Sequence, residues 1–323
     1  MCDISDPVAG SEATPRLAFG LARAMARLAS LRDDAALGVA EAVACGPAAV
    51  PALSRLLFAR ESSGIYEPRR RAVEALAGLK AYDVLAEYLA TPRRIVDPVE
   101  ETGEEAVMSA AARVLADWPD ERVRPLLMAL ARRAPLAGVI DALSKLRCAE
   151  AIPYFIKALA DDFTRPAAEE ALRSFGTETA PALLEAARSR VPPGCQESVS
   201  RLRYRRSALA LLAEIGLGAD RQVSEIESFI DEQDPALAVL GCRIVLAEID
   251  AESSAAFRRL IALLPIVDLL LRVEIEECLV RHFAPAQVHI AEALQQVGTA
   301  PEEMRLTRLL HRVVARGAGS ASK

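Results

Sequence analysis

The sequence predicts an all-α protein, an α-solenoid (superhelix) of about seven to eight helical pairs with a capping helix at each end. A pattern of Leu-x-x-apolar, at the end of an Ala-rich stretch, recurs about every thirty to forty residues, a period typical of stacked helical repeats. No stretch alternates apolar and polar residues for long enough to predict a strand. Gly and Pro fall between the helical stretches, where the chain has to turn.

The recurring Leu marks the buried face of the second helix in each pair. Its copies are Leu76/Leu79, Leu115/Trp118, Leu143/Leu146, Leu172/Phe175, Leu212/Ile215 and Leu246/Ile249, with looser copies at Ala40/Val43 and Leu279/His282. With this Leu as position zero, small or apolar residues also stand at −4 and −1, and these spacings lie on one face of a helix. We therefore expect Trp118, at +3, to be a core residue rather than a platform for ligands.

The first helix of each pair begins with a proline signature. Near copies contain Pro51, Pro153 and Pro181, and a shifted copy contains Pro125. Proline suits the first turn because its fixed φ matches the helix and no hydrogen bond is lost. Each unit therefore reads as helix, turn, helix.

This unit resembles the HEAT repeat, over roughly residues 33–300. The A-[VI]-P-x-L start, followed about twenty residues later by R-x-x-A-x-x-x-L, is most similar to the short variety known from phycobilisome lyases. The family's Arg stands seven residues before the Leu, and it is present here as Arg69, Arg165, Arg205 and Arg272. Met108, Leu136 and Val239 replace it in other copies. The resemblance implies a right-handed, armadillo-type stack in which these arginines are structural, with Asp161 or Asp162 as the partner of Arg165.

Three regions follow from this organisation. Residues 1–32 are expected to form a tail and a capping helix (15–32), residues 33–300 the repeats, and residues 301–323 a capping helix (301–316) and a disordered tail. The basic amphipathic helix 301–316 could lie on a membrane. A terminal repeat needs a polar outer face, however, so we expect it to act as a cap and expect no membrane partner.

Three turns between paired helices are longer than the others: 60–67, 91–103 and 189–202. All fall between the first and the second helix of a pair, so they are expected on one edge of the stack. Tolerated surface insertion is the ordinary interpretation, because loops accept extra length at little cost. A binding edge is the alternative.

Bulk composition narrows the function classes. The net charge of −6 argues against nucleic-acid binding, which stays an alternative through the Arg clusters 69–71 and 203–206. Six scattered cysteines without a C-x-x-C pair indicate reduced thiols. No secretory or membrane-spanning segment is apparent, so a cytoplasmic protein is expected, and the Ala- and Arg-rich composition suggests a bacterial source.

Catalytic and metal chemistry have few candidate residues. Cys278, His282 and His289 lie near one another in the sequence, but a metal site needs three or four ligands held together. We expect no catalytic residue, no metal and no cofactor. The resemblance to phycobilisome lyases leaves a bilin-lyase-type enzyme, or a chaperone of a cofactor-bearing protein, as an alternative.

The outward face of the second helices is expected to be acidic. Small residues (Gly78, Ala110, Gly138, Ala167, Ala210 and Gly241) lie between the charges and could floor a groove. The ordinary interpretation is a solvated face of mixed charge. Our hypothesis is a non-enzymatic scaffold that binds a basic or amphipathic segment of another protein in this groove; the oligomeric state is not predicted. The candidate binding residues are Glu74, Asp141, Glu170, Glu214, Glu248 and Glu277.

Overall fold

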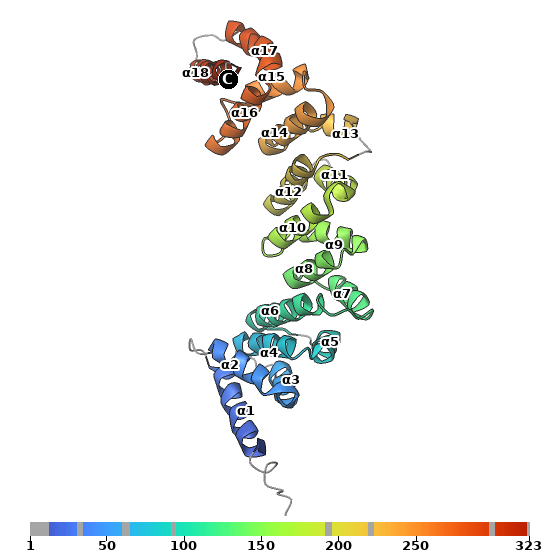
Figure 1. Ribbon diagram of the computed structural model, residues 1–323. Helices are drawn as coiled ribbons and strands as arrows, with labels where there is room; N and C mark the ends of the chain where they lie inside the picture. The colour runs from blue at the N-terminus through green and yellow to red at the C-terminus, as the bar shows by residue number, and fades with distance from the viewer. Residues whose placement is uncertain are drawn as a thin grey trace, which may run out of the picture. The chain divides into compact units, whose positions relative to one another are not determined.

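The computed structural model describes residues 13–30, 35–59, 65–91, 93, 95–190, 196–218, 223–296 and 301–321. Within these ranges the protein is all-helical and contains no strand, as predicted. The chain divides into two compact units, Met1–Phe155 and Ile156–Lys323, called here the N-terminal and the C-terminal unit (Figure 1). Helix α9 (Ile152–Ala158) contains the boundary between them.

The N-terminal unit consists of paired helices. Their bounds are α1 (Ala13–Ala29), α2 (Ala35–Ala44), α3 (Val50–Phe58), α4 (Glu67–Gly78), α5 (Tyr82–Ala90), α6 (Pro98–Leu115), α7 (Val123–Ala131) and α8 (Ala137–Lys145). Each odd-numbered helix packs on the even-numbered helix that follows it. The even-numbered helices also contact one another in series, from α2 through α4 and α6 to α8.

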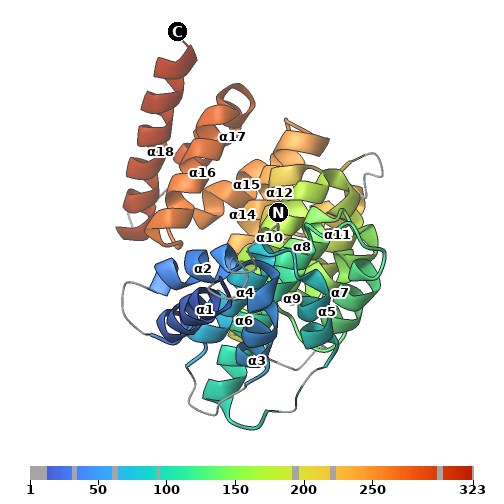
Figure 2. The same ribbon diagram turned by 60° about the horizontal axis from the view of Figure 1, so that its bottom comes forward.

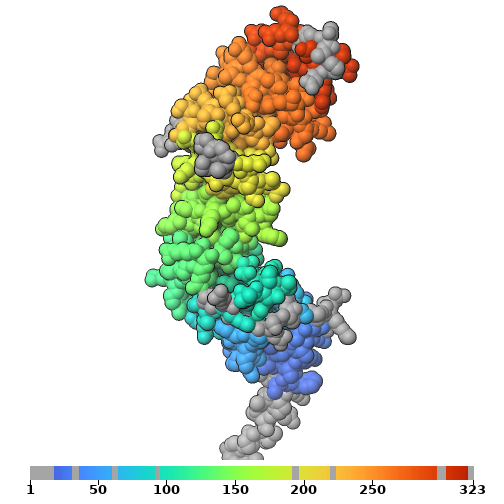
Figure 3. Space-filling model, turned by 180° about the vertical axis from the view of Figure 1, so that it is seen from behind, coloured from blue at the N-terminus to red at the C-terminus, as the bar shows by residue number. Residues whose placement is uncertain are grey.

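The C-terminal unit repeats this arrangement. Its helices are α10 (Arg165–Phe175), α11 (Ala180–Arg188), α12 (Val199–Ile215), α13 (Val223–Glu227), α14 (Pro235–Ile244), α15 (Ser254–Leu263), α16 (Leu269–Arg281), α17 (Phe283–Gln296) and α18 (Pro301–Ala321). The contact series runs from α10 through α12, α14 and α16 to α18. These sequential contacts are consistent with a helical repeat array. In Figure 3 the C-terminal unit has a continuous surface on the face in view.

The predicted buried stripe is present in both units. The seven Leu residues at position zero, from Leu76 to Leu279, are at most 1% exposed. The seven residues at −4, from Ala72 to Ile275, are completely buried. The +3 position was predicted less well: Phe175 is buried, but Trp118 and the other anchors are half-buried, because this position lies at the margin of the stripe.

The four arginines at −7 share one contact. Each donates its Nε–H to a carbonyl of the segment that ends the preceding helix: Arg69 to Leu57, Arg165 to Leu159, Arg205 to Ala187 and Arg272 to Leu264, at 3.0, 3.0, 2.7 and 3.4 Å. The last carbonyls of a helix lack partners within it. These arginines therefore tie each second helix to the end of the first helix before it.

The long turns are shorter than expected where the structure describes them. Helix α6 already begins at Pro98, because the Asp97 side chain accepts hydrogen bonds from the backbone N–H groups of Val99 and Glu100. Ser198 caps α12 in the same way, through Arg201 N–H, so residues 199–202 are helical. Residues 60–64, 92, 94 and 191–195 of these insertions lie outside the described residues.

The disordered tail expected from Gly317 is wrong as far as Ala321, because α18 continues to that residue. Gly317 allows α18 to approach α17 closely, since a Cβ there would lie 2.3 Å from the ring of Phe283. Helices α16, α17 and α18 pack on one another (Figure 2). Residues 1–12 and 322–323 lie outside the described part of the chain.

Candidate protein-binding surface on the second helices

The face of each even-numbered helix that points away from the buried stripe is called here the second-helix surface. Each unit has its own: α4, α6 and α8 provide it in the N-terminal unit, and α10, α12, α14 and α16 in the C-terminal unit. Of the six predicted acids, Glu74 and Asp141 belong to the first unit, and the other four to the second. The six residues therefore form two sets rather than one site.

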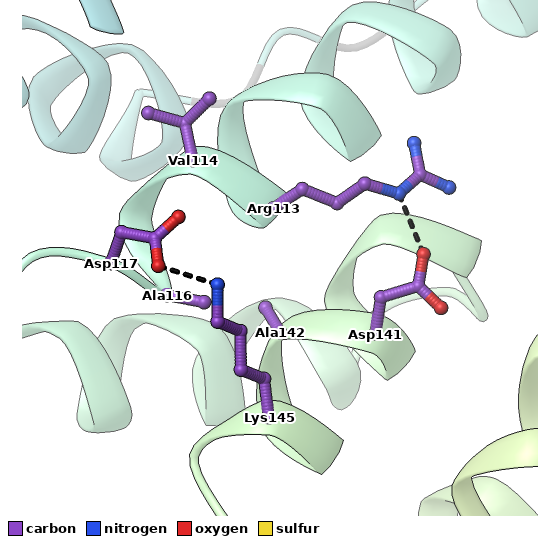
Figure 4. A pocket seen from close by; sticks show the side chains of 7 residues that line it. All are labelled: Arg113, Val114, Ala116, Asp117, Asp141, Ala142 and Lys145. Atoms are coloured by element: carbon purple, nitrogen blue, oxygen red, sulfur yellow. Dashed lines mark hydrogen bonds and ion pairs between the residues drawn. The ribbon is translucent and has the colours of Figure 1, made fainter.

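In the N-terminal unit the acids are largely neutralised. Arg113 of α6 and Asp117, in the turn after α6, face Asp141 and Lys145 of α8 across a hollow of about 360 Å³ (Figure 4). Arg113 Nε lies 2.6 Å from Asp141, and Lys145 Nζ lies 2.5 Å from Asp117. Two positive charges thus balance two negative ones. All four side chains are 41 to 60% exposed, so each pair contributes at most about 1 kcal/mol to stability.

Glu74 is also paired, along its own helix. Its carboxylate lies 2.6 Å from the guanidinium of Arg70, one turn earlier on α4. The hydrogen bonds that Arg70 donates to Glu67, and the charges of Glu74 and Glu67, raise the pKa of Arg70 above its usual value. This ion pair has the spacing of four residues that stabilises an exposed helix. Glu74 is therefore a weak candidate for an incoming cation.

The C-terminal unit has an excess of acid around Arg173. This guanidinium lies 3.0 Å from Glu214 of α12, 3.7 Å from Glu170 and 3.8 Å from Glu169 of its own helix α10. Its pKa is raised, first by the hydrogen bond with Glu214. Three carboxylates share one positive charge here, and Glu170 and Glu214 are 81% and 55% exposed. The surface between α10 and α12 is therefore acidic and accessible.

The two remaining acids differ from each other. Glu248 is half-buried in a π-helical segment (Val245–Ile249) that extends α14. Glu277 of α16 is exposed, and it forms no ion pair with any other described residue. Its neighbour Glu274 is held by Arg243 of α14 at 3.1 Å. Glu277 is thus an exposed carboxylate that no described base holds in an ion pair.

The arginine clusters considered for nucleic-acid binding are engaged within their own units. Arg70 binds Glu67 and Glu74, and Arg71 donates to the carbonyls of Leu28 and Ser30. In the second cluster, Arg203 pairs with Asp162, Arg205 with Glu232 and Glu197, and Arg206 with Asp234. These contacts compete with phosphate groups for the same guanidinium donors.

Two of the small residues expected to form the floor of a groove are instead buried between helices. Gly138 and Gly241 are buried contact points between helices: a Cβ at Gly138 would lie 1.9 Å from Ser109 O of α6, and one at Gly241 would lie 2.5 Å from Phe229 Cβ. The expectation failed because both glycines lie where neighbouring backbones approach closely. Gly78 and Ala210 are exposed.

Two features of the C-terminal unit were missed in the sequence. Buried carboxylates hold arginines from other elements: Glu232 pairs with Arg190 and Arg205, which precede it, and Glu276 with Arg312 and Arg316 of α18. The second feature is an exposed apolar start of α16. Its signal was Val273, which occupies the repeat position that Arg206 holds in α12.

Trp118 and His289 stack on neighbouring rings, and the described cysteine and histidine residues form no metal cluster. The Trp118 ring stacks on Tyr82 with centroids 5.6 Å apart, and the guanidinium of Arg122 lies 4.9 Å from it. His289 stacks on Phe257. Among the described residues no three His, Cys, Asp or Glu side chains are arranged to hold a metal ion. In the same part of the chain no helix is long and apolar enough to span a bilayer.

Comparison with known proteins gives no assignment: no protein-family model matches the chain, and no curated protein matches its sequence.

Proposed function

We propose that the chain is a HEAT-like α-solenoid that acts as a non-enzymatic interaction scaffold. Its second-helix surface in the C-terminal unit binds a basic or amphipathic segment of a partner protein. The repeated arginine contact at −7 and the buried stripe support the HEAT-like interpretation. Such stacks commonly present extended surfaces to partners.

The observation that carries the proposal is the acid excess around Arg173. Three carboxylates face one guanidinium there, and two of them are more than half exposed. An incoming lysine or arginine would find accessible acceptors without having to break a buried pair. The N-terminal unit supports this role less well, because its four facing charges cancel.

The test uses a synthetic 18-residue helical peptide of leucine and lysine, with the leucines on one face. Charge reversal by Glu170→Lys with Glu214→Lys should slow association of this peptide about tenfold at low ionic strength, because charge at an interface mainly controls the association rate. The difference should largely disappear in 1 M salt, where the Debye length is about 3 Å. Stopped-flow anisotropy of a labelled peptide gives both rates.

The matched control reverses two exposed acids of the same unit that lie off the second-helix surface, Glu178 and Glu227. Glu178→Lys with Glu227→Lys changes the net charge equally and should alter the rate less than twofold. Equal slowing in both variants would contradict the proposed site, and so would the absence of slowing in both. Far-UV circular dichroism should be the same for all the proteins.

A further inference from the structure

The start of α16 exposes a group of large apolar side chains. Leu269, Leu270 and Val273 are 67%, 78% and 41% exposed, and Ile266, in the turn before the helix, is 68% exposed. Single exposed apolar residues are common, but neighbouring ones that form a patch mark interaction sites. This group of exposed apolar side chains therefore indicates an interaction site.

The patch continues into the acid of the same helix face. Leu269, Val273 and Glu277 follow one another at intervals of four residues and so lie one above the other. Leu270 lies beside them, seven residues before Glu277, which corresponds to about 10 Å along the helix. We call this surface, formed by Leu269, Leu270, Val273 and Glu277, the α16 face.

Other elements of the C-terminal unit leave the α16 face exposed. Ile275, Glu276, Cys278 and Leu279 form the buried side of the helix. Helix α18 packs on α16 and secures itself there through Arg312 and Arg316, which both pair with the buried carboxylate of Glu276. The cap of the array thus lies against the side of α16 that contains Glu276.

The charges around the patch indicate the chemistry of the occupant. Glu277 forms no ion pair among the described residues, and Asp268, which caps the helix through Leu271 N–H, is exposed. Arg272 turns away to the carbonyls of Leu264 and Val267. Bases on this side include Arg281, which is exposed one turn beyond Glu277, and Arg206 of α12, which pairs with Asp234. Acid next to the apolar patch favours a basic partner and disfavours an anionic lipid surface.

We propose that the α16 face anchors an amphipathic helix of a partner protein. Its apolar residues cover Leu269, Leu270 and Val273, and a lysine or arginine about 10 Å further along pairs with Glu277. This inference rests on the proposed function and makes it more specific: the bound segment is a helix with a leucine-rich face, rather than an extended basic stretch.

Three peptides test it: the leucine–lysine helix, a scrambled peptide of the same composition without an apolar face, and a leucine–glutamate helix. The leucine–lysine helix should bind at least tenfold more tightly than the scrambled peptide. Leu269→Ser with Leu270→Ser should weaken its binding at least tenfold. Val199→Ser with Val288→Ser, which alters two residues 66% and 60% exposed elsewhere in this unit, should change binding less than twofold.

Glu277→Lys tests the charge. It should weaken binding of the leucine–lysine helix about fivefold and strengthen binding of the leucine–glutamate helix, a reversal that mere unfolding could not produce. Equal binding of the scrambled peptide, or equal losses in the serine variant and its control, would overturn the inference. So would sedimentation with anionic phosphatidylserine vesicles that depends on Leu269 and Leu270.

The outcomes separate the two proposals. If reversal at Glu170 and Glu214 slows association but the serine variant binds normally, the α16 anchor is wrong and the proposed function stands. If the serine variant alone loses binding, the α16 face binds the helix without the acids of α10 and α12. Failure of every peptide to bind would contradict both.

Discussion

Buried arginines account for much of the local order in this chain. Arg205 is 2% exposed and contacts Ala187 O, Glu197 and Glu232, so it joins three segments of the C-terminal unit. Its position at −7 was readable from the repeat register. Its partners were not, because Glu232 lies 27 residues away in the next helical pair.

Arg205→Met should lower the free energy of unfolding by about 3–5 kcal/mol, since it leaves buried carboxylates with fewer partners. Arg203→Met, on the same helix, removes an exposed pair with Asp162 and should cost less than about 1 kcal/mol. Urea unfolding followed by circular dichroism measures both. Similar losses in the two variants would mean that Arg205 does not have this structural role.

Two buried thiols make the C-terminal unit sensitive to alkaline pH. Burial raises the pKa of Cys242 from 9.0 to about 12 and that of Cys278 from 9.0 to about 11. Above pH 9 the unfolded chain loses these protons while the folded chain retains them, so the free energy of unfolding should fall as pH rises. Urea titrations at pH 8 and pH 10 should show a smaller fall for Cys242→Ala with Cys278→Ala. An identical fall would exclude the thiols as its source.

Individual helices were predictable where their signals are local. The intervals −4 and zero identify the buried stripe, because a helix turns every 3.6 residues. Helix boundaries were less predictable: α6 begins early because of the Asp97 cap, and α18 continues past Gly317, which lies close to Phe283. These helix boundaries depend on individual contacts, which the spacing of apolar residues does not reveal.

Contacts between helices depend on single glycines. Gly138→Ala should destabilise the N-terminal unit by about 1–3 kcal/mol, because the added Cβ would lie 1.9 Å from Ser109 O on the neighbouring helix α6. Gly20→Ala, inside α1, meets only Cys45 Sγ at 3.9 Å and should stabilise by about 0.5–1 kcal/mol. Urea unfolding measures whether each substitution lowers or raises the free energy of unfolding. A neutral Gly138→Ala would show that α6 and α8 can separate without cost.

Across the whole chain, the repeat register predicted that the acids lie on the outward face. It could not predict which basic residues surround them. Arg113 meets Asp141 across 28 residues, and Arg173 meets Glu214 across 41. Pairing at such distances depends on how successive helices stack and on side-chain reach. The six acids occupy comparable positions in the repeat, but Glu74 and Asp141 belong to the N-terminal unit and the other four to the C-terminal unit.

This division gives a prediction about the N-terminal unit. Glu74→Lys with Asp141→Lys should change the association rate of the leucine–lysine helix less than twofold, because Arg113 and Lys145 balance Asp141 and Asp117, and Glu74 is held 2.6 Å from Arg70. The same stopped-flow measurement serves for this variant. A slowing as large as that expected for Glu170 and Glu214 would contradict this prediction and would indicate that the peptide binds the N-terminal unit.

Photo-crosslinking shows directly where an amphipathic basic helix binds this protein. A leucine–lysine helix carrying a benzophenone on its apolar face would be irradiated with the intact protein, and the linked residues mapped by mass spectrometry. Links are expected on the outward faces of α10, α12 and α16 in the C-terminal unit, and they should be lost when excess unlabelled peptide is added. Links concentrated on α11, α15 or α17, or in the N-terminal unit, would contradict this expectation.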